Sequence, residues 1–139
     1  FTDTDELLGA VYDVVVADLI AALTEAMSHG PDDRARLRAG ISTVLEFSSV
    51  DPRRGRILFT EARTNPVLAE RRSAVQDQLR KSVLTDGHAA SPTARTAELV
   101  GAAMYAGAMA ELAQQWLAGN LGTDLEPVVD SAVQLLMPA

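Results

Sequence analysis

The chain has 139 residues, of which 47% are hydrophobic, and this size suits a single domain that can bury a core. It contains no cysteine, which excludes disulfides, thiolate nucleophiles and thiolate metal sites and suits a reducing cytoplasmic location. A formal net charge of −7 argues against nucleic-acid binding by these residues. We expect no membrane partner, because no apolar run approaches the length needed to cross a bilayer.

Six helices are predicted in chain order, and no alternating pattern predicts a strand. Aromatic residues make up only 4% of the chain, so the core must be built from alanine, leucine, valine and methionine, which favours helices. Gly30-Pro31 and the polar segment 86–92 mark two of the breaks between helices. The expected helices span 4–28, 32–49, 52–63, 65–84, 93–118 and 124–137. The predicted fold class is therefore all-α.

Charge is distributed unevenly along the chain. Residues 53–81 carry eight basic and three acidic side chains, whereas the segments on both sides are acidic. A basic segment of this kind can form an anion site. It is more often a solvated helical face, and we adopt this second interpretation.

The last two predicted helices carry more apolar surface than one core requires. The segment 119–122 (GNLG) separates them, with two glycines and an asparagine as a stop signal. On the helix 93–118, the alanines form one face, while Tyr105 and Met109 belong to a face of larger side chains. We expect the alanine face and the last helix to meet a second copy of the chain, and the larger side chains to face the subunit's own core. The expected dimer-interface residues are Ala106, Ala110, Ala113, Leu117, Leu125, Val129, Ala132 and Leu136.

Between Leu99 and Ala110, the helix 93–118 is apolar on nearly all sides, so other helices should surround it. Its glycines and alanines permit either close helix packing, which is the more common case, or an open cavity. Methionine and aromatic side chains with a few polar groups are typical of a small-molecule site, although they also occur in ordinary cores. The candidate ligand-binding residues are Phe47, Phe59, Arg63, Met104, Tyr105 and Ala108.

Little in the sequence indicates catalysis, and it assigns no catalytic residue, metal site or cofactor. The two histidines, His29 and His88, both lie beside glycines in predicted loops and far apart in the sequence. No histidine pair at helical spacing, Glu-x-x-His motif or glycine-rich phosphate loop occurs. We therefore expect that the protein is not an enzyme.

Three motifs, in their order along the chain, resemble a known family. The opening Phe1–Leu8 (FTDTDELL) resembles the junction in TetR-type (tetracycline-repressor-like) transcriptional regulators, where the DNA-binding headpiece ends and a long connecting helix begins. The segment 51–70 is similar to a helix-turn-helix run common in their regulatory domains, and 116–129 is similar to their C-terminal ending. Thr4 departs from the pattern, because many members carry a lysine there.

The resemblance implies a fold and a function for the whole chain. Residues 1–139 would form an effector-binding and dimerisation domain, with 1–8 as the junction to a helix-turn-helix domain that precedes Phe1. The last two helices of this six-helix regulatory domain would join those of a second copy in a four-helix bundle. An unknown small-molecule effector, held in a pocket among the first five helices, would shift the first helix and weaken operator DNA binding by a repressor. The alternative is a helical homodimeric interaction module without a ligand.

Overall fold

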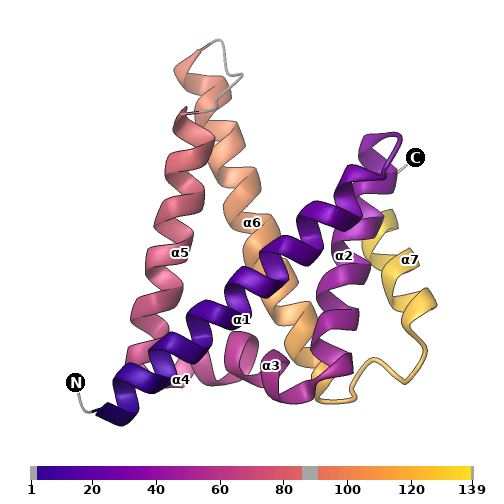
Figure 1. Cartoon of the computed structure of the whole chain (residues 1–139). Coiled ribbons are helices and arrows are strands. Elements are labelled where there is room, and N and C mark those ends of the chain that lie inside the picture. The colour runs from indigo at the N-terminus through magenta and orange to yellow at the C-terminus, as the bar shows by residue number, and fades with distance from the viewer. Residues whose placement is uncertain (1–2, 86–90, 139) are drawn as a thin grey trace.

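The computed structural model describes residues 3–85 and 91–138, and within them the chain is all-helical (Figure 1). The two longest helices, α1 and α6, have 26 residues each. The bounds are α1 Asp3–Ser28, α2 Asp33–Val50, α3 Pro52–Arg56, η1 Ile57–Glu61, α4 Ala62–Thr64, α5 Pro66–Thr85, α6 Pro92–Leu117 and α7 Leu125–Leu136.

The prediction of an all-α chain with six helices is confirmed over the described residues, with bounds that differ by at most one residue at each end. The third predicted helix, 52–63, is a continuous helical segment with a π-helical turn, η1, between α3 and α4. Such a turn accommodates an extra residue in the backbone ladder and gives no simple periodic signal in a sequence. The predicted polar loop lies mostly in 86–90, outside the described residues, whereas Pro92 at its end already belongs to α6.

Short polar side chains set the starts of the helices. The carboxylate of Asp32 accepts a hydrogen bond from the Ala35 amide at 2.8 Å, and the hydroxyl of Ser91 accepts one from the Ala94 amide at 3.2 Å. Each bond satisfies an amide that the first helical turn leaves without a backbone partner. At the other end of α6, Gly119 and Gly122 have φ values of +79° and +90°, a region that favours glycine and allows the chain to turn towards α7.

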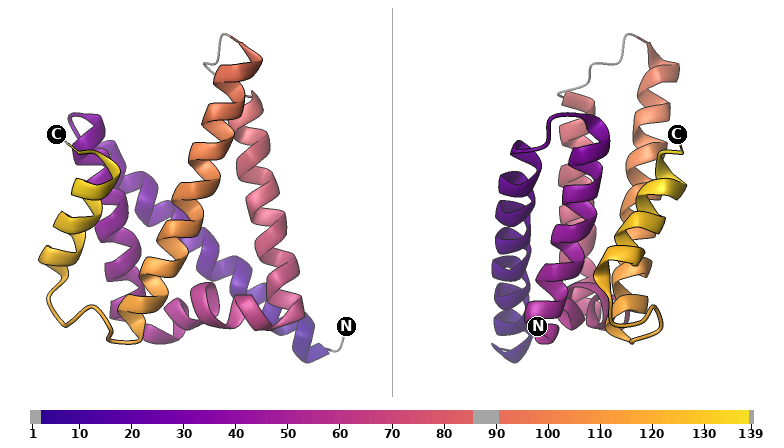
Figure 2. Two further views of the ribbon diagram at one scale, coloured as in Figure 1. Left: turned by 180° about the vertical axis from the view of Figure 1, so that it is seen from behind. Right: turned by 90° about the vertical axis from the view of Figure 1, so that its right-hand side faces the viewer.

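Helix α2 occupies the centre of the arrangement. It packs against α1, α3, α6 and α7, whereas α5 lies against α1 and α6. The side view in Figure 2 shows α1 on one side, α2 and α5 in the middle, and α6 and α7 on the other side. This layering separates α1 from α6, and α2, α5 and η1 each contact both of them.

Two groups of buried side chains hold these layers together. The first joins α2, α6 and α7 through Ile41, Leu45 and Val133, all of them inaccessible to solvent. The second joins α1 to α5 and to the 52–64 segment, with Tyr12 and Leu68 at its centre. Burial of apolar side chains of this size contributes roughly 1.5–3 kcal/mol each, so both groups are major sources of stability.

Ion pairs link helices that are distant in sequence. Arg71 of α5 pairs with Asp13 of α1, and Arg38 of α2 pairs with Asp130 of α7. The basic segment identified in the sequence is therefore not uniformly a solvated face, because some of its arginines bind acidic residues of other helices. Since these pairs remain largely solvent-exposed, each contributes only ~0–1 kcal/mol, and they act mainly to fix helix orientation.

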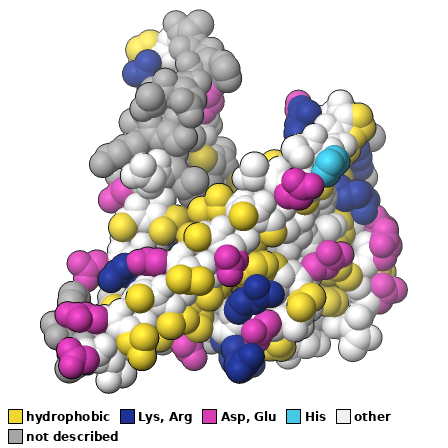
Figure 3. Space-filling model, viewed as in Figure 1, with side chains coloured by type: hydrophobic (Ala, Val, Ile, Leu, Met, Phe, Trp, Pro, Cys, Tyr) yellow, Lys and Arg dark blue, Asp and Glu magenta, His cyan; other side chains and the backbone are white. Residues whose placement is uncertain are grey.

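Helix α1 requires a correction to the sequence analysis. Its 26 residues include an 18-residue window with a mean hydropathy of 1.9, so length and composition would allow it to cross a membrane. Hydrophobic side chains gather along this helix in Figure 3, and Leu7 is 66% exposed. Tyr12 and Val15 of α1 are buried in the second core group, but only 17% of the window is buried, and a single helix of this kind is weak evidence for a membrane span. The fold is compatible with a soluble protein.

We predict that Asp51 stabilises the start of α3 in a pH-dependent manner. Its carboxylate accepts hydrogen bonds from the Arg53 side chain and backbone amide, which hold its pKa below the usual range. A lowered pKa means that the stabilisation is present above the unfolded carboxyl pKa of about 3.9 and is lost as pH falls through the folded value. Asp51→Ala should therefore lower the melting temperature by a few degrees at pH 7 and much less at pH 3, as thermal denaturation followed by circular dichroism can measure.

Candidate functional site

A hollow of about 350 Å³ is bounded by α1, α2 and α6. Helix α2 packs against both of the other two helices. The walls of the hollow are almost entirely apolar and come from three helices. The lining residues are Leu23, Met27, Asp33, Arg36, Leu37, Val44, Tyr105 and Met109. A concave apolar site of this size with a few polar groups has the character of a small-molecule site.

The absence of a side chain at Gly40 leaves room for Tyr105 and Met27, two residues that line the hollow. A Cβ atom at Gly40 would lie 3.3 Å from the Tyr105 hydroxyl and 3.6 Å from the Met27 sulfur. Tyr105 of α6 and Met27 of α1 therefore approach each other over the backbone of α2. A methyl group at this position would crowd the Tyr105 hydroxyl, whereas its distance from the Met27 sulfur is an ordinary contact.

The Tyr105 hydroxyl is available to a ligand. Among the side chains that the structure describes, none forms a hydrogen bond with it, although the ring is half-buried. Burial raises the pKa of Tyr105 above its ordinary value of 10.0, so the hydroxyl stays protonated at neutral pH. It can then donate a hydrogen bond, and tyrosine hydroxyls within protein interiors usually have a partner.

The charged residues of this hollow neutralise each other. Arg36 forms an ion pair with Asp33, and its second terminal nitrogen donates to the Gly30 carbonyl oxygen at 3.3 Å. Both are in the first turns of α2 and more exposed than the apolar wall. The hollow therefore presents no unpaired charge among its described lining residues.

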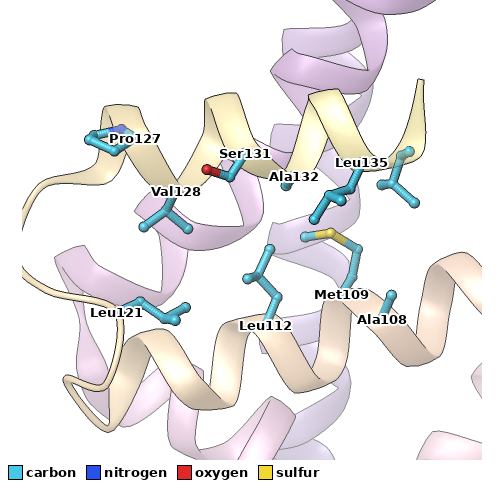
Figure 4. Close-up of a pocket in the computed structure, with 10 residues that line it drawn as sticks. Ala108, Met109, Leu112, Leu121, Pro127, Val128, Ser131, Ala132 and Leu135 are labelled. Carbon is cyan, nitrogen blue, oxygen red and sulfur yellow. The ribbon is translucent and has the colours of Figure 1, made fainter. Parts of the chain in front are cut away.

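A second hollow, a groove of about 450 Å³, separates α6 from α7 (Figure 4). Helix α7 packs on α2 and leaves this groove open along α6, so the two predicted hairpin helices are not packed closely together. In Figure 4, Met109 and Leu112 of α6 point towards α7, and Val128 points back from the other side. The lining residues are Ala108, Met109, Leu112, Leu121, Pro127, Val128, Ser131, Ala132, Leu135 and Leu136.

Exposed apolar side chains continue from this groove along both of its helices. Leu135 is 82% exposed on α7, and Met104 is 71% exposed on α6, one turn before Ala108. Large apolar residues with this degree of exposure are informative when they form a continuous patch, because such patches commonly mark interaction sites.

Met109 lines both hollows. Its side chain is only 6% exposed and belongs to the core group of α2, α6 and α7. A displacement of Met109 in the hollow beside α1 would therefore also alter the wall of the groove between α6 and α7.

The structure does not bring the six predicted ligand-binding residues together. Tyr105 alone lines the hollow between α1 and α6, while Ala108 lines the groove. Met104 points to the surface. Phe47 is buried in the second core group beneath the Arg54 guanidinium, and Phe59 packs between both groups.

Arg63, the one charged residue in the predicted ligand set, forms an ion pair with Glu111 at 2.9 Å. The pKa of Glu111 is lowered, first by a hydrogen bond from Gln115 and then by the bond from Arg63. Arg63 therefore links α4 to α6 and does not line either hollow.

The eight predicted interface residues divide into three groups. Ala110, Ala113 and Val129 are buried in this chain's own core, so they are not accessible to a second subunit in this fold. Leu117, Leu125 and Ala132 are half-buried, and Ala132 lines the groove. Ala106 and Leu136 are exposed. The small side chains of Ala110 and Ala113 permit α6 to pack closely on α2, which explains why the face of α6 that carries them is buried.

Sequence reasoning did not assign Met27 and Leu37 to a site, although both line the hollow between α1 and α6. Leu37 was visible only as an apolar residue on a helical face. The periodicity of each helix shows which residues face inwards, but not which inward faces meet around an empty space.

The described residues contain no candidate metal centre, and the comparison with protein families found no match. Within residues 3–85 and 91–138, no group of three or more acidic or histidine side chains could hold a metal ion. His29 is exposed and lies 2.9 Å from Glu25, and His88 lies outside the described residues. No model of a protein family matches the chain, and no curated protein is significantly similar to it.

Proposed function

We propose that this chain is the effector-binding and dimerisation domain of a cytoplasmic, TetR-type transcriptional regulator that acts as a repressor. The observation that carries the proposal is the apolar hollow beside α1, which has Leu23 and Met27 of that helix in its wall. The order of the sequence motifs supports the same assignment. Helix α1 would be the connection to a DNA-binding headpiece preceding Phe1.

A ligand in this hollow would act on α1 directly. It would contact Leu23 and Met27 on the C-terminal half of the helix, whereas a headpiece would be attached at the N-terminal end. A ligand shifts a conformational equilibrium only through its different affinities for the two states, and couplings of ~1–3 kcal/mol are typical. Two recognition helices must match half-sites about 34 Å apart, so a small movement of α1 is sufficient to weaken operator binding.

The second part of the proposal is a homodimer formed through the groove between α6 and α7. Its lining contains no charged residue and includes the exposed side chains of Leu135 and Leu136, and exposed Met104 extends its apolar surface along α6. A two-fold axis would bring the same face of each copy together, so apolar residues of one chain would fill the groove of the other. Ala106, Ala132 and Leu136 remain from the interface predicted by the sequence. Exposed Leu135 and Met104 are added to this interface, whereas buried Ala110 and Ala113 are not part of it.

The regulator proposal can be tested with the complete gene product that contains this chain. It should be incubated with fragments of its own genome, and the retained DNA should be sequenced. We expect enrichment of an inverted repeat with half-sites about one helical turn apart, as a two-fold symmetric dimer requires. Failure to retain any particular sequence under low-salt conditions would contradict the regulator proposal.

The groove favours a second candidate function. Its volume of about 450 Å³ and its lining without a charged residue would support dimerisation without any ligand. The chain would then be a helical homodimeric interaction module. Sedimentation analysis showing a stable dimer, together with no ligand-dependent change in any DNA interaction, would favour this candidate.

A further inference from the structure

We propose that the hollow between α1, α2 and α6 binds an uncharged, largely aromatic molecule that carries one hydrogen-bond acceptor. This inference rests on the proposed function and specifies the chemistry of its effector. It depends on three features of the hollow: the pairing of its charges, the free tyrosine hydroxyl and the thioether walls.

The pairing of charges disfavours an ionic ligand. Asp33 and Arg36 are the two charged residues of the lining, and they bind each other. A ligand carboxylate would have to compete with Asp33 for Arg36, and a ligand cation would have to compete with Arg36 for Asp33. Moving an ion into an apolar hollow without a free counter-charge is strongly unfavourable. A neutral molecule avoids this cost.

The Tyr105 hydroxyl selects an acceptor. It is protonated, has no described hydrogen-bond partner and lies over the bare backbone at Gly40. A carbonyl or ether oxygen beside it would accept its hydrogen. A purely hydrocarbon ligand would leave the hydroxyl partly desolvated and without a partner, which is unfavourable.

The thioethers favour an aromatic ring. Met27 and Met109 line the hollow from α1 and α6, and Tyr105 adds an aromatic ring to the wall. Methionine sulfur makes favourable contacts with aromatic rings, and its flexible side chain adapts to their shape. Aromatic pairs add further stabilisation through stacked or edge-to-face contacts. The remaining wall, Leu23, Leu37 and Val44, suits the same apolar body.

The test uses three probes of nearly equal size: 2-acetylnaphthalene, 2-isopropylnaphthalene and 2-naphthoate. They present a neutral acceptor, no acceptor and a negative charge on the same ring system. Affinities for the full chain would be measured by ligand-observed NMR titration at pH 7. We expect the ketone to bind about 10-fold more tightly than the hydrocarbon, as one hydrogen bond allows, and 2-naphthoate to bind most weakly.

Two variants at the hollow and one control variant test where the preference arises. Tyr105→Phe should abolish the preference for the ketone over the hydrocarbon, whereas Tyr12→Phe, which removes the hydroxyl of a tyrosine outside the hollow, should retain it. Gly40→Ala places a methyl group 3.3 Å from the Tyr105 hydroxyl and should weaken all neutral probes, which provides a second assay if Tyr105→Phe folds poorly.

Three results would overturn the inference: tightest binding of 2-naphthoate, an unchanged ketone preference in Tyr105→Phe, or no binding of any probe at millimolar concentration. Failure of the proposed function is distinguishable from these results. If the gene product selects an inverted repeat while the probes bind in another order, only the ligand class is wrong. If the probes bind as expected while no DNA sequence is selected, the regulator proposal is wrong and the ligand class stands.

Discussion

A Leu135→Glu variant is expected to convert the proposed dimer into a folded monomer. Leu135 is 82% exposed in the isolated chain, so the substitution should change the stability of the subunit little. In the dimer, the new carboxylate would lie in an apolar groove without a charged lining residue to pair with it. Burying an unpaired charge costs several kcal/mol, which corresponds to a dissociation constant at least ~100-fold higher. Sedimentation equilibrium over a concentration series measures this change.

The controls for this prediction distinguish the groove from other apolar surfaces. Leu7→Glu makes the same change at an exposed leucine of α1 and should leave the dimer intact. Ala110→Glu, by contrast, places the charge in the chain's own core and should unfold the subunit, which circular dichroism would reveal. Equal dimer affinity of the wild type and Leu135→Glu would show that the groove is not the interface.

Gly55→Ala is expected to destabilise the chain by about 1–3 kcal/mol, the usual range for overpacking a well-filled site. A Cβ atom at Gly55 would lie 2.9 Å from a methyl group of Leu117 and 2.9 Å from the Cβ of Ser48. The leucine tip can rotate away. The Cβ of Ser48 cannot, because it is attached directly to the backbone of α2 and that residue is fully buried. Urea denaturation at a fixed protein concentration measures the loss.

Gly101→Ala is the matched control, since a Cβ atom at Gly101 in α6 has no neighbour within 4 Å. Alanine is favoured over glycine in a helix by up to about 1 kcal/mol, so this substitution should stabilise the chain. We therefore expect the same substitution to lower the stability of the chain at Gly55 and to raise it at Gly101. If Gly55→Ala were as stable as the wild type, α2 and α3 would have more freedom to separate than their packing implies.

Much of the local structure follows from the sequence. The turn residues around Gly30 and Gly119 correctly separated the helices, and the predicted start of the third helix at Pro52 is correct. These features could be predicted from the sequence because each depends on residues within one or two helical turns of one another. The sequence did not predict the π-helical turn η1, because its hydrogen-bond pattern leaves no distinct spacing of apolar residues.

The candidate sites were harder to predict from the sequence than the helices. Met104 and Tyr105 are neighbours in sequence, yet one is exposed beside the groove and the other lines the hollow next to α1. Both were assigned to the same pocket on the basis of their chemistry alone. A rotation of 100° between successive helical residues is sufficient to place them on different surfaces.

The sequence by itself determined that this protein is all-helical, where its helices begin and end, and that its C-terminal helices carry surplus apolar surface. Each of these properties is local, because it depends on composition, capping and periodicity along one segment. Only the tertiary structure decided which apolar face turned inwards: Ala110 and Ala113 entered the core, whereas Leu135 stayed outside. The physical reason is that small side chains permit α6 to approach α2 closely, and this choice depends on the shape of a neighbouring helix that no single segment encodes.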